Sequence, residues 1–174
     1  AVNNAYMSIN KGDIYGFVGE NGSGKTTIIR LITGLIYPDS GSFELFGVSD
    51  KSKNIGIARS RVGAIVETPS IYLNMSAYDN LKILNKMSNN PISNEEIKSI
   101  LVNFGLEPNS KKVFKAFSLG MKQKLRLAQA FMGNPELIVL DEPTNALDEN
   151  SVKNIHQFIK QQKEKGATIL LASH

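Results

Sequence analysis

The chain has 174 residues, enough for one domain with a hydrophobic core and too few for two ordinary domains. Apolar residues make up 41% and charged residues 21%, and no apolar run approaches the roughly 20 residues of a membrane span, so disordered, fibrous and membrane-spanning chains are excluded. Cysteine is absent, which excludes disulfides and thiolate metal sites and favours a cytosolic protein, and the modest net charge of +4 predicts a solvated surface instead of a nucleic-acid site.

The two ends of the sequence favour a trimmed chain. It starts at Ala1 instead of methionine, within strand-like sequence, and it stops at His174 directly after an apolar run. We therefore expect flanking elements to be missing. We expect no secretory leader either, because no cationic and apolar segment opens the chain.

The N-terminal part combines strand and helix patterns. Residues 1–18 alternate between apolar and polar and predict strands that end in IYGFV, with turn signals at 10–13 and with Tyr6 in the core. The apolar residues of TTIIRLITG recur at helical spacing up to Gly34. SFELFG then predicts a short strand after a turn.

The middle of the chain changes from a strand to a series of helices. RVGAIVE, residues 61–67, predicts a strand, and residues 68–132 predict mainly helices, which we assign to a helical sub-lobe. Serines followed three residues later by an acid fit capping boxes at Ser76 and Ser93. A third helix is predicted over residues 118–132.

Two continuous apolar runs dominate the C-terminal part. LIVL (137–140) and TILLA (168–172) are typical of strands buried on both faces of a parallel sheet. SVKNIHQFIKQQKEK, between them, predicts an amphipathic helix that ends at Gly166. We expect one domain over the whole chain, with its core formed by residues 1–67 and 133–174.

A glycine-rich loop between the first strand and the first helix carries the strongest signal. GENGSGKT, Gly19–Thr26, matches the pattern G-x-x-x-x-G-K-[ST] in its full strand, loop and helix context. Glycines let backbone N–H groups turn toward phosphate oxygens, and the start of the helix adds its dipole. Lys25 neutralises the outer phosphates and the Thr26 hydroxyl is a magnesium ligand, so the loop predicts nucleoside triphosphate binding.

An acidic pair follows the first apolar run. Asp141 and Glu142 come directly after LIVL, at the carboxyl end of a strand, where ligands collect in open parallel sheets. An aspartate there can hold magnesium, and the adjacent glutamate can polarise a water molecule for attack on the γ-phosphate. An isolated acidic pair of this kind often only caps a loop. The pair indicates a nucleotide site only in combination with the phosphate loop.

These motifs resemble the nucleotide-binding domain of an ATP-binding cassette (ABC) ATPase over nearly the whole chain. SLGMKQ, LIVLDEPTNALD and the final SH follow GENGSGKT in the order of that family. The resemblance implies an α/β fold: a P-loop NTPase (RecA-like) core with a mostly parallel sheet, an antiparallel N-terminal β part and a helical sub-lobe. It also implies ATP and Mg²⁺ as ligands.

The resemblance assigns roles residue by residue. The catalytic residues it implies are Glu142, His174 in the position of the switch histidine, and Lys25. The metal ligands it implies are Thr26, Asp141 and Glu67. The nucleotide contacts it implies are Gly19, Glu20, Asn21, Gly22, Ser23, Gly24, Lys25, Thr26, Thr27, Ser118, Gly120 and Asp148.

The signature segment predicts a site shared between two chains. FSLGM, 117–121, corresponds to the family's LSGGQ, which contacts the nucleotide held by a partner cassette, so a second ABC ATPase subunit is implied. Ser118 can cap a helix whose positive end faces that γ-phosphate. Leu119 and Met121 depart from the family pattern. A plain capped helix with Met121 and Leu125 on its core face fits the same sequence.

Glu67 stands where most members of the family have the Q-loop glutamine. A glutamate keeps an oxygen ligand for a hard cation but adds a negative charge and lacks the amide donor. We expect Glu67 to sense ATP and Mg²⁺. The alternative is an exposed acid that ends a strand.

Other polar and aromatic residues have weaker signals. A histidine after a strand is most often an ordinary polar residue, and only the surrounding motifs favour a catalytic His174. His156 has no such context and is expected to be structural. The family stacks the base on an aromatic residue before the loop, but neither Tyr6 nor Tyr15 fits, so we expect that residue outside the sequence.

The family implies the ATPase subunit of a membrane transporter, at the cytoplasmic face of the membrane through permease subunits. Residues 68–81 lie where the family receives a coupling helix, and Ile71, Tyr72, Leu73 and Tyr78 predict either an exposed apolar groove or sub-lobe core. The combination of IVETPS with SLGMKQ resembles transporters for resistance to bacitracin and lantibiotics, which favours export of a peptide antibiotic.

Two other functions stay open from the sequence. The first is a soluble ABC ATPase that acts in translation or on DNA, which in the family carries two fused cassettes or a long coiled-coil insertion. The second is a nucleotide-dependent scaffold without hydrolysis, which Glu142 disfavours.

Overall fold

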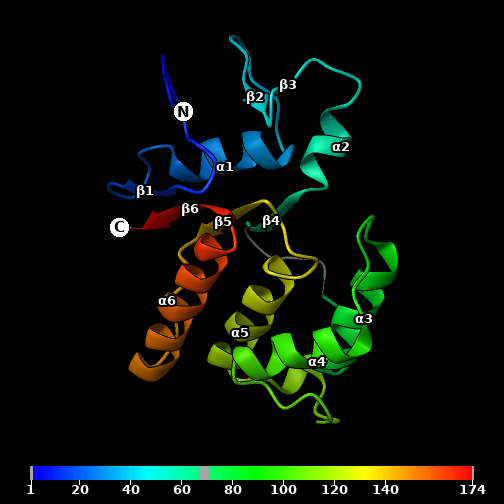
Figure 1. The fold of residues 1–174 in the computed structure, drawn as a ribbon. Coiled ribbons are helices and arrows are strands. Elements are labelled where there is room, and N and C mark those ends of the chain that lie inside the picture. The colour runs from blue at the N-terminus through cyan, green and yellow to red at the C-terminus, as the bar shows by residue number, and fades with distance from the viewer. Residues whose placement is uncertain (1, 67–70, 174) are drawn as a thin grey trace.

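A parallel sheet forms the centre of the computed structural model, which describes residues 2–66 and 71–173 (Figure 1). Within these residues, four strands form the sheet, in the spatial order β1 (Ile14–Val18), β6 (Thr168–Ser173), β5 (Leu137–Asp141) and β4 (Val62–Ile65). All neighbouring pairs are parallel, so the carboxyl ends of the strands meet at one edge. The predicted parallel sheet is confirmed, with strands from both ends of the chain side by side.

Helices cover both faces of the sheet (Figure 1). Helix α1 (Lys25–Thr33) lies on one face, and α5 (Leu119–Ala130) and α6 (Glu149–Glu164) lie on the other. Alternate residues of β5 serve the two faces, since Val139 packs in the cluster with α1 whereas Ile138 packs in the cluster with α5 and α6. This two-sided burial explains why LIVL is apolar at every position.

A small antiparallel hairpin follows α1. Strands β2 (Glu44–Leu45) and β3 (Val48–Ser49) are joined by Phe46 and Gly47, both with positive φ angles of 54° and 74°. Positive φ at both central residues is typical of the tight turns that suit antiparallel strands. The predicted antiparallel β part is this hairpin.

The short helix α2 (Ile55–Arg59) was not predicted, because five residues with a glycine at position 56 show no helical periodicity. It ends against the C-terminus of α1. The Arg59 guanidinium donates to the carbonyl oxygens of Ile32 at 3.3 Å and Leu31 at 3.4 Å. The Ile32 carbonyl thereby gains a donor from α2, and the Leu31 carbonyl, which also accepts from the Gly34 N–H at 3.2 Å, gains a second one.

The predicted helices of the middle segment are α3 (Ala77–Met87) and α4 (Asn94–Asn103), followed by the 3₁₀ turn η1 (Phe114–Ala116). Ser93 forms the complete capping box with Glu96. Ser76 differs from the prediction: its hydroxyl accepts from the Asp79 N–H but donates to the Asp79 carboxylate at 2.6 Å. That carboxylate bonds the hydroxyl, so no bond from it to the Ser76 backbone is formed in this cap.

Two predictions near the chain ends were wrong in part. Residues 2–13 form no strand in the described structure, and Tyr6 is 95% exposed instead of lying in the core. Alternation alone does not make a strand, because a strand needs a neighbour to bond and a face to bury. The last helix begins at Glu149, before the predicted start, because Asp148 caps it.

One hydrophobic cluster joins the middle helices to the sheet. Leu81 of α3 and Leu101 of α4 belong to the same cluster as Leu125 of α5 and Ile138 of β5. The division into a core and a sub-lobe therefore stays a prediction. Among the helices of residues 2–66 and 71–173, none is both long and apolar enough to cross a membrane.

Candidate nucleotide-binding site

The phosphate loop wraps around the side chain of Lys25. Its ammonium group donates to the carbonyl oxygens of Gly19 at 2.5 Å and Glu20 at 3.0 Å, on the opposite side of the loop. Gly24, with φ of 94°, precedes α1 and offers no side-chain cap to it. The first N–H groups of α1 are therefore available for an anion, as the sequence predicts for a phosphate site.

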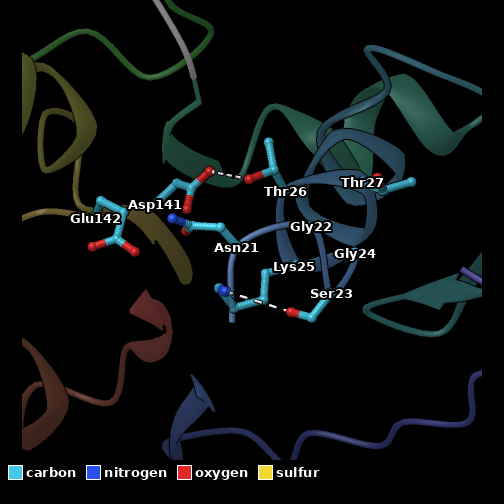
Figure 2. Close-up of a pocket in the computed structure, with 9 residues that line it drawn as sticks. All are labelled: Asn21, Gly22, Ser23, Gly24, Lys25, Thr26, Thr27, Asp141 and Glu142. Carbon is cyan, nitrogen blue, oxygen red and sulfur yellow. Dashed lines mark hydrogen bonds between the residues drawn. The ribbon is translucent and has the colours of Figure 1, made fainter. Parts of the chain in front are cut away.

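An open cleft of about 270 Å³ lies at the carboxyl edge of the sheet (Figure 2). It brings together the phosphate loop, the first turn of α1 and the end of β5, which are more than 110 residues apart in sequence (Thr26 to Asp141 is 115 positions). The residues that line it are Asn21, Gly22, Ser23, Gly24, Lys25, Thr26, Thr27, Asp141 and Glu142. The loop and the acidic pair predicted as separate motifs thus share one cleft.

A short hydrogen bond connects the two halves of the cleft. The Thr26 hydroxyl donates to Asp141 Oδ2 at 2.7 Å (Figure 2). Both groups offer hard oxygen atoms, so this donor set fits Mg²⁺. Among the described residues there is no cluster of three acidic or histidine side chains, and a magnesium ion here would take its other ligands from phosphate and water.

Glu142 sits on a turn of unusual backbone conformation. Its φ angle is 48°, in the left-handed region that non-glycine residues seldom adopt, and its N–H donates to the Ala172 carbonyl at 3.0 Å. The turn closes with a bond from the Asn145 N–H to the Glu142 carbonyl at 3.3 Å. The bonds of this turn hold the residue predicted as catalytic at the mouth of the cleft.

Gln123, the last residue of SLGMKQ, contacts the same turn, a role that the sequence did not predict. It lies on α5 and is only 7% exposed, and its side-chain amide donates to the Pro143 carbonyl at 3.1 Å. The spacing of 20 residues to Pro143 carries no sequence signal, because only the packing of α5 brings the two together.

The signature residues lie outside the lining of the cleft. Ser118 caps α5 as predicted, with its hydroxyl accepting from the Met121 N–H at 3.2 Å, and Leu119 beside it is 69% exposed. Gly120 packs closely on the following turn, since a Cβ there would lie 3.1 Å from the Ala146 carbonyl oxygen. Neither Ser118 nor Gly120 lines the cleft formed by the described residues of its own chain.

Asp148 caps α6. Its carboxylate accepts from the Ser151 N–H at 2.9 Å and from the Ser151 hydroxyl at 2.7 Å. Hydrogen bonds from the Ser151 backbone and side chain, and then the nearby charge of Lys124, lower the pKa of Asp148. A structural role is therefore visible, beside the nucleotide contact that the family resemblance implies.

The segment predicted to receive a coupling helix is divided between core and surface. Ile71 and Tyr78 pack against the main hydrophobic cluster, whereas Tyr72 and Leu73 are 47% and 58% exposed. The buried Asn80 side chain anchors the turn, accepting from the Tyr72 N–H at 2.7 Å and donating to its carbonyl at 3.1 Å. Ile71 and Tyr78 are thus core residues, whereas Tyr72 and Leu73 are exposed, and the apolar groove stays a prediction.

The same turn is bonded to the segment that precedes the signature helix. The N–H groups of Phe114 and Lys115 donate to the carbonyl oxygens of Met75 and Leu73, each at 2.9 Å. The exposed apolar turn and the start of α5 are thereby connected through backbone hydrogen bonds.

The remaining sequence predictions concern Glu67, His174, Tyr15 and His156. Glu67 and His174 lie outside the described residues. Tyr15 packs edge-on against Phe17 at a ring distance of 5.5 Å, as expected for a strand residue without a role in base stacking. His156 is exposed on α6.

Comparison with known proteins establishes the family. The family model for ABC transporters matches residues 2–145. The chain belongs to the ABC transporter family. It is an ATP-binding ABC domain, and its fold is the P-loop NTPase fold.

Two kinds of relative are named for antibiotic transport. Bacitracin transport ATP-binding protein BcrA of Enterococcus faecalis is 42% identical over 174 residues, 99% of this chain and 56% of that protein. Lantibiotic transport ATP-binding protein SrtF of Streptococcus pyogenes is 39% identical over 173 residues, 99% of this chain and 73% of that protein. The chain thus spans little more than half the length of the bacitracin relative.

A solved structure shares the fold. It is described as a dimeric bacterial ABC transporter cassette, matches with a TM-score of 0.86 at 22% identity, and covers 97% of this chain and 77% of its own. The likeness extends over nearly the whole chain and confirms the predicted fold class.

Proposed function

We propose that this ABC domain binds and hydrolyses ATP as the energy-supplying subunit of a transporter that exports a peptide antibiotic of the bacitracin or lantibiotic kind. The observation that carries the catalytic part is the 2.7 Å hydrogen bond between Thr26 and Asp141, in a cleft that Lys25 and Glu142 also line. One cleft thereby holds a phosphate cradle, two hard oxygen donors and a carboxylate at its mouth.

Each residue of the cleft has a chemical task in this proposal. The N–H groups of the loop and the Lys25 ammonium bind the β- and γ-phosphates. Thr26 and Asp141 would hold Mg²⁺, which supplies positive charge to neutralise the phosphates when bound. Glu142 orients the attacking water and accepts its proton. Its carboxylate suits this task because Glu142 follows β5 directly and lines the same cleft as the phosphate loop (Figure 2).

The signature residues support a dimer of two cassettes. Ser118 and Gly120 do not line the cleft of their own chain in the described structure, yet Ser118 begins a helix whose positive end suits a phosphate. In the proposed dimer this end faces the nucleotide of the partner, and Asp148 approaches the same interface. A solved cassette of this fold is described as dimeric, which supports a pairing of two cassettes.

We propose membrane-spanning permease subunits as the other partners, at the cytoplasmic face of the membrane. The exposed side chains of Tyr72 and Leu73 offer the apolar contact, and Asn80 fixes their backbone. Transport of a peptide antibiotic is supported by the names of the two transport relatives, each about 40% identical to this chain. The alternative of a translation or DNA factor has no such support.

The catalytic proposal is tested by exchanging Glu142 for glutamine in the intact protein. Glu142→Gln keeps the size of the side chain but removes the base, so we expect ATP turnover to fall by about two to four orders of magnitude. ATP binding should persist and trap the dimer. Phosphate release and light scattering with and without ATP measure both effects, and equal turnover in wild type and variant would disprove the role of Glu142.

The transport proposal needs a test in cells. A strain that carries the intact protein with its permease should become more sensitive to bacitracin or a lantibiotic when Glu142→Gln replaces the wild type. A full-length chain with two fused cassettes and no membrane partner would favour the soluble alternative instead.

Glu67 and His174 keep their sequence-based roles as proposals. Glu67 would sense the nucleotide, so Glu67→Gln should retain ATP binding and much of the turnover whereas Glu67→Ala should uncouple hydrolysis from transport. Unchanged antibiotic resistance in the Glu67→Ala strain would contradict this role. His174 would contact the γ-phosphate, and unchanged turnover in His174→Ala would contradict that contact.

A further inference from the structure

A buried amide joins the signature helix to the turn that carries Glu142. Gln123 lies in the second turn of α5, and its side-chain nitrogen donates to the carbonyl oxygens of Pro143 at 3.1 Å and Glu142 at 3.4 Å. Both acceptors follow β5 directly. The bonds therefore run from the helix that begins at Ser118 to the backbone of the residue that performs the chemistry in the proposed function.

The turn is of a kind that needs such support. Glu142 and Ala146 both have positive φ angles, 48° and 64°, although neither is a glycine. Residues in this region persist where the surrounding contacts hold them. Because the backbone conformation at Glu142 sets the direction of its Cα–Cβ bond, any relaxation of the turn would move the carboxylate relative to the cleft.

Two neighbours of Gln123 on α5 bear on the same turn. Gly120 lets the helix approach the Ala146 carbonyl closely, and the Lys124 ammonium lies 4.0 Å from the carboxylate of Asp148. Among these contacts only Gln123 reaches Glu142 itself. The first two turns of α5 and residues 142–148 are thus packed as one unit.

The burial of Gln123 also indicates that its amide is needed for hydrogen bonding. Gln123 is 7% exposed, and the other buried residues of α5 include Leu125, Leu127 and Ala128. An apolar side chain would fill such a place without the cost of burying an amide. The buried amide supplies a donor to the Pro143 carbonyl and a second donor to the Glu142 carbonyl, which also accepts from the Asn145 N–H.

We propose that Gln123 is a positioning residue for hydrolysis, which fixes the backbone of Glu142 and so aims its carboxylate at the attacking water. This inference rests on the proposed function, because it assigns Gln123 a part in the same reaction. Gln123 does not touch the phosphates, so its loss should change the chemical step and leave nucleotide binding intact.

The test compares Gln123→Met with wild type in the intact protein. Methionine has nearly the same length and no donor, so it fills the space and removes only the two hydrogen bonds. We expect kcat for ATP hydrolysis to fall at least about tenfold and KM to stay within about twofold, since a small misplacement of a catalytic group slows the chemical step. Gln123→Glu, which cannot donate to a carbonyl when ionised, should show the same split.

Gln162→Met on α6 provides a matched control. Gln162 is also 7% exposed, but it lies near the end of α6, outside the residues that line the cleft. The Gln162→Met variant should alter the unfolding temperature of the protein without changing kcat for ATP hydrolysis. Unfolding temperatures of all variants identify any loss of fold, and assays are made well below the lowest one.

The outcomes separate this inference from the proposed function. An active wild type with Gln123→Met and Gln123→Glu at wild-type kcat would overturn the role of Gln123 alone. A rise in KM as large as the fall in kcat would also overturn it, because the residue would then act on binding. A wild type without ATP turnover would overturn the proposed function and the role of Gln123 with it.

Discussion

Gly63 lies where the carbonyl oxygen of Ala130 comes closest to strand β4. A Cβ atom at position 63 would lie 1.8 Å from that oxygen, far inside contact distance, and the oxygen belongs to backbone that cannot rotate away. The glycine that interrupts the apolar pattern of RVGAIVE is therefore a packing requirement. It lets the end of the signature helix rest directly on the sheet.

We expect Gly63→Ala to destabilise the protein by about 3 kcal/mol, at the upper end of what overpacking costs. Gly16→Ala in β1 is the control, because a Cβ there meets no atom within 4 Å. Unfolding in denaturant measures both. Equal stability of the two variants would show that α5 moves off β4 without cost.

A second residue contact joins the starts of two strands. The Arg61 guanidinium binds both carboxylate oxygens of Glu136 at 2.7 Å and stacks over the Phe46 ring at 4.0 Å. Hydrogen bonds and charge from Arg61 lower the pKa of Glu136. The side chains are 40% and 43% exposed, so solvent screens the pair and limits its contribution to about 1 kcal/mol at most.

This pair predicts a pH dependence with a defined sign. A lowered pKa in the folded state means that the stabilisation is present above the ordinary glutamate pKa of about 4.3 and is lost as the pH falls through the lower folded value. Glu136→Gln should therefore be less stable than wild type at pH 7, and the difference should shrink below about pH 4. Urea unfolding across this range measures it, and a constant difference would contradict the assignment.

At the scale of elements, two helices begin with the same serine N-cap, but only one of them belongs to the proposed dimer interface. Ser118 caps α5 and Ser93 caps α4, each accepting from the N–H three residues later at 3.2 Å. As caps alone, both serines should contribute similar stability, since loss of such a cap costs about 1 kcal/mol. Only Ser118 belongs to the proposed partner site.

We expect Ser93→Ala and Ser118→Ala to lower stability alike, whereas ATP turnover should fall only in Ser118→Ala. The loss should be severalfold or more, because Ser118 offers a hydroxyl to the γ-phosphate of the partner's nucleotide in the proposed dimer. Steady-state ATPase rates and unfolding curves give both quantities. Equal turnover in the two variants would leave Ser118 with the role of a cap alone.

Elements with a local cause could be predicted from the sequence. The phosphate loop, the serine caps and the two buried strands each depend on a short sequence pattern. The residues of each pattern determine the local structure without contacts from elsewhere in the chain. The five residues of α2 and the irregular course of 2–13 could not be predicted, because their conformation depends on neighbours elsewhere in the fold. The site divides in the same way: Asp141 follows a local pattern, whereas Gln123 acquires its partners only through the packing of α5 on the turn after β5.

At the scale of the whole molecule, α5 connects the parts that the proposed cycle has to coordinate. Its start follows a segment bonded to the exposed turn of Tyr72 and Leu73, its second turn holds the backbone of Glu142, and its end rests on Gly63. A shift of this helix would act on all three at once. The cleft of one chain includes no signature residue of that chain among the described residues, which agrees with the proposed dimer, in which each complete site takes residues from two copies.

A mixture of two inactive variants tests this shared site. Lys25→Ala removes the phosphate-binding ammonium from one cleft, and Ser118→Glu places a negative charge where the partner's γ-phosphate should lie, so each variant alone should hydrolyse little ATP. In a mixed dimer both defects fall in the same site, and the other site combines an intact Lys25 with an intact Ser118. An equal mixture forms mixed dimers in half of the cases, each with one good site of two, so about a quarter of the wild-type rate should return. ATPase assays of each variant and of the mixture, after exchange of subunits, measure it, and a rate no higher than the mean of the two variants would show that the site is not shared.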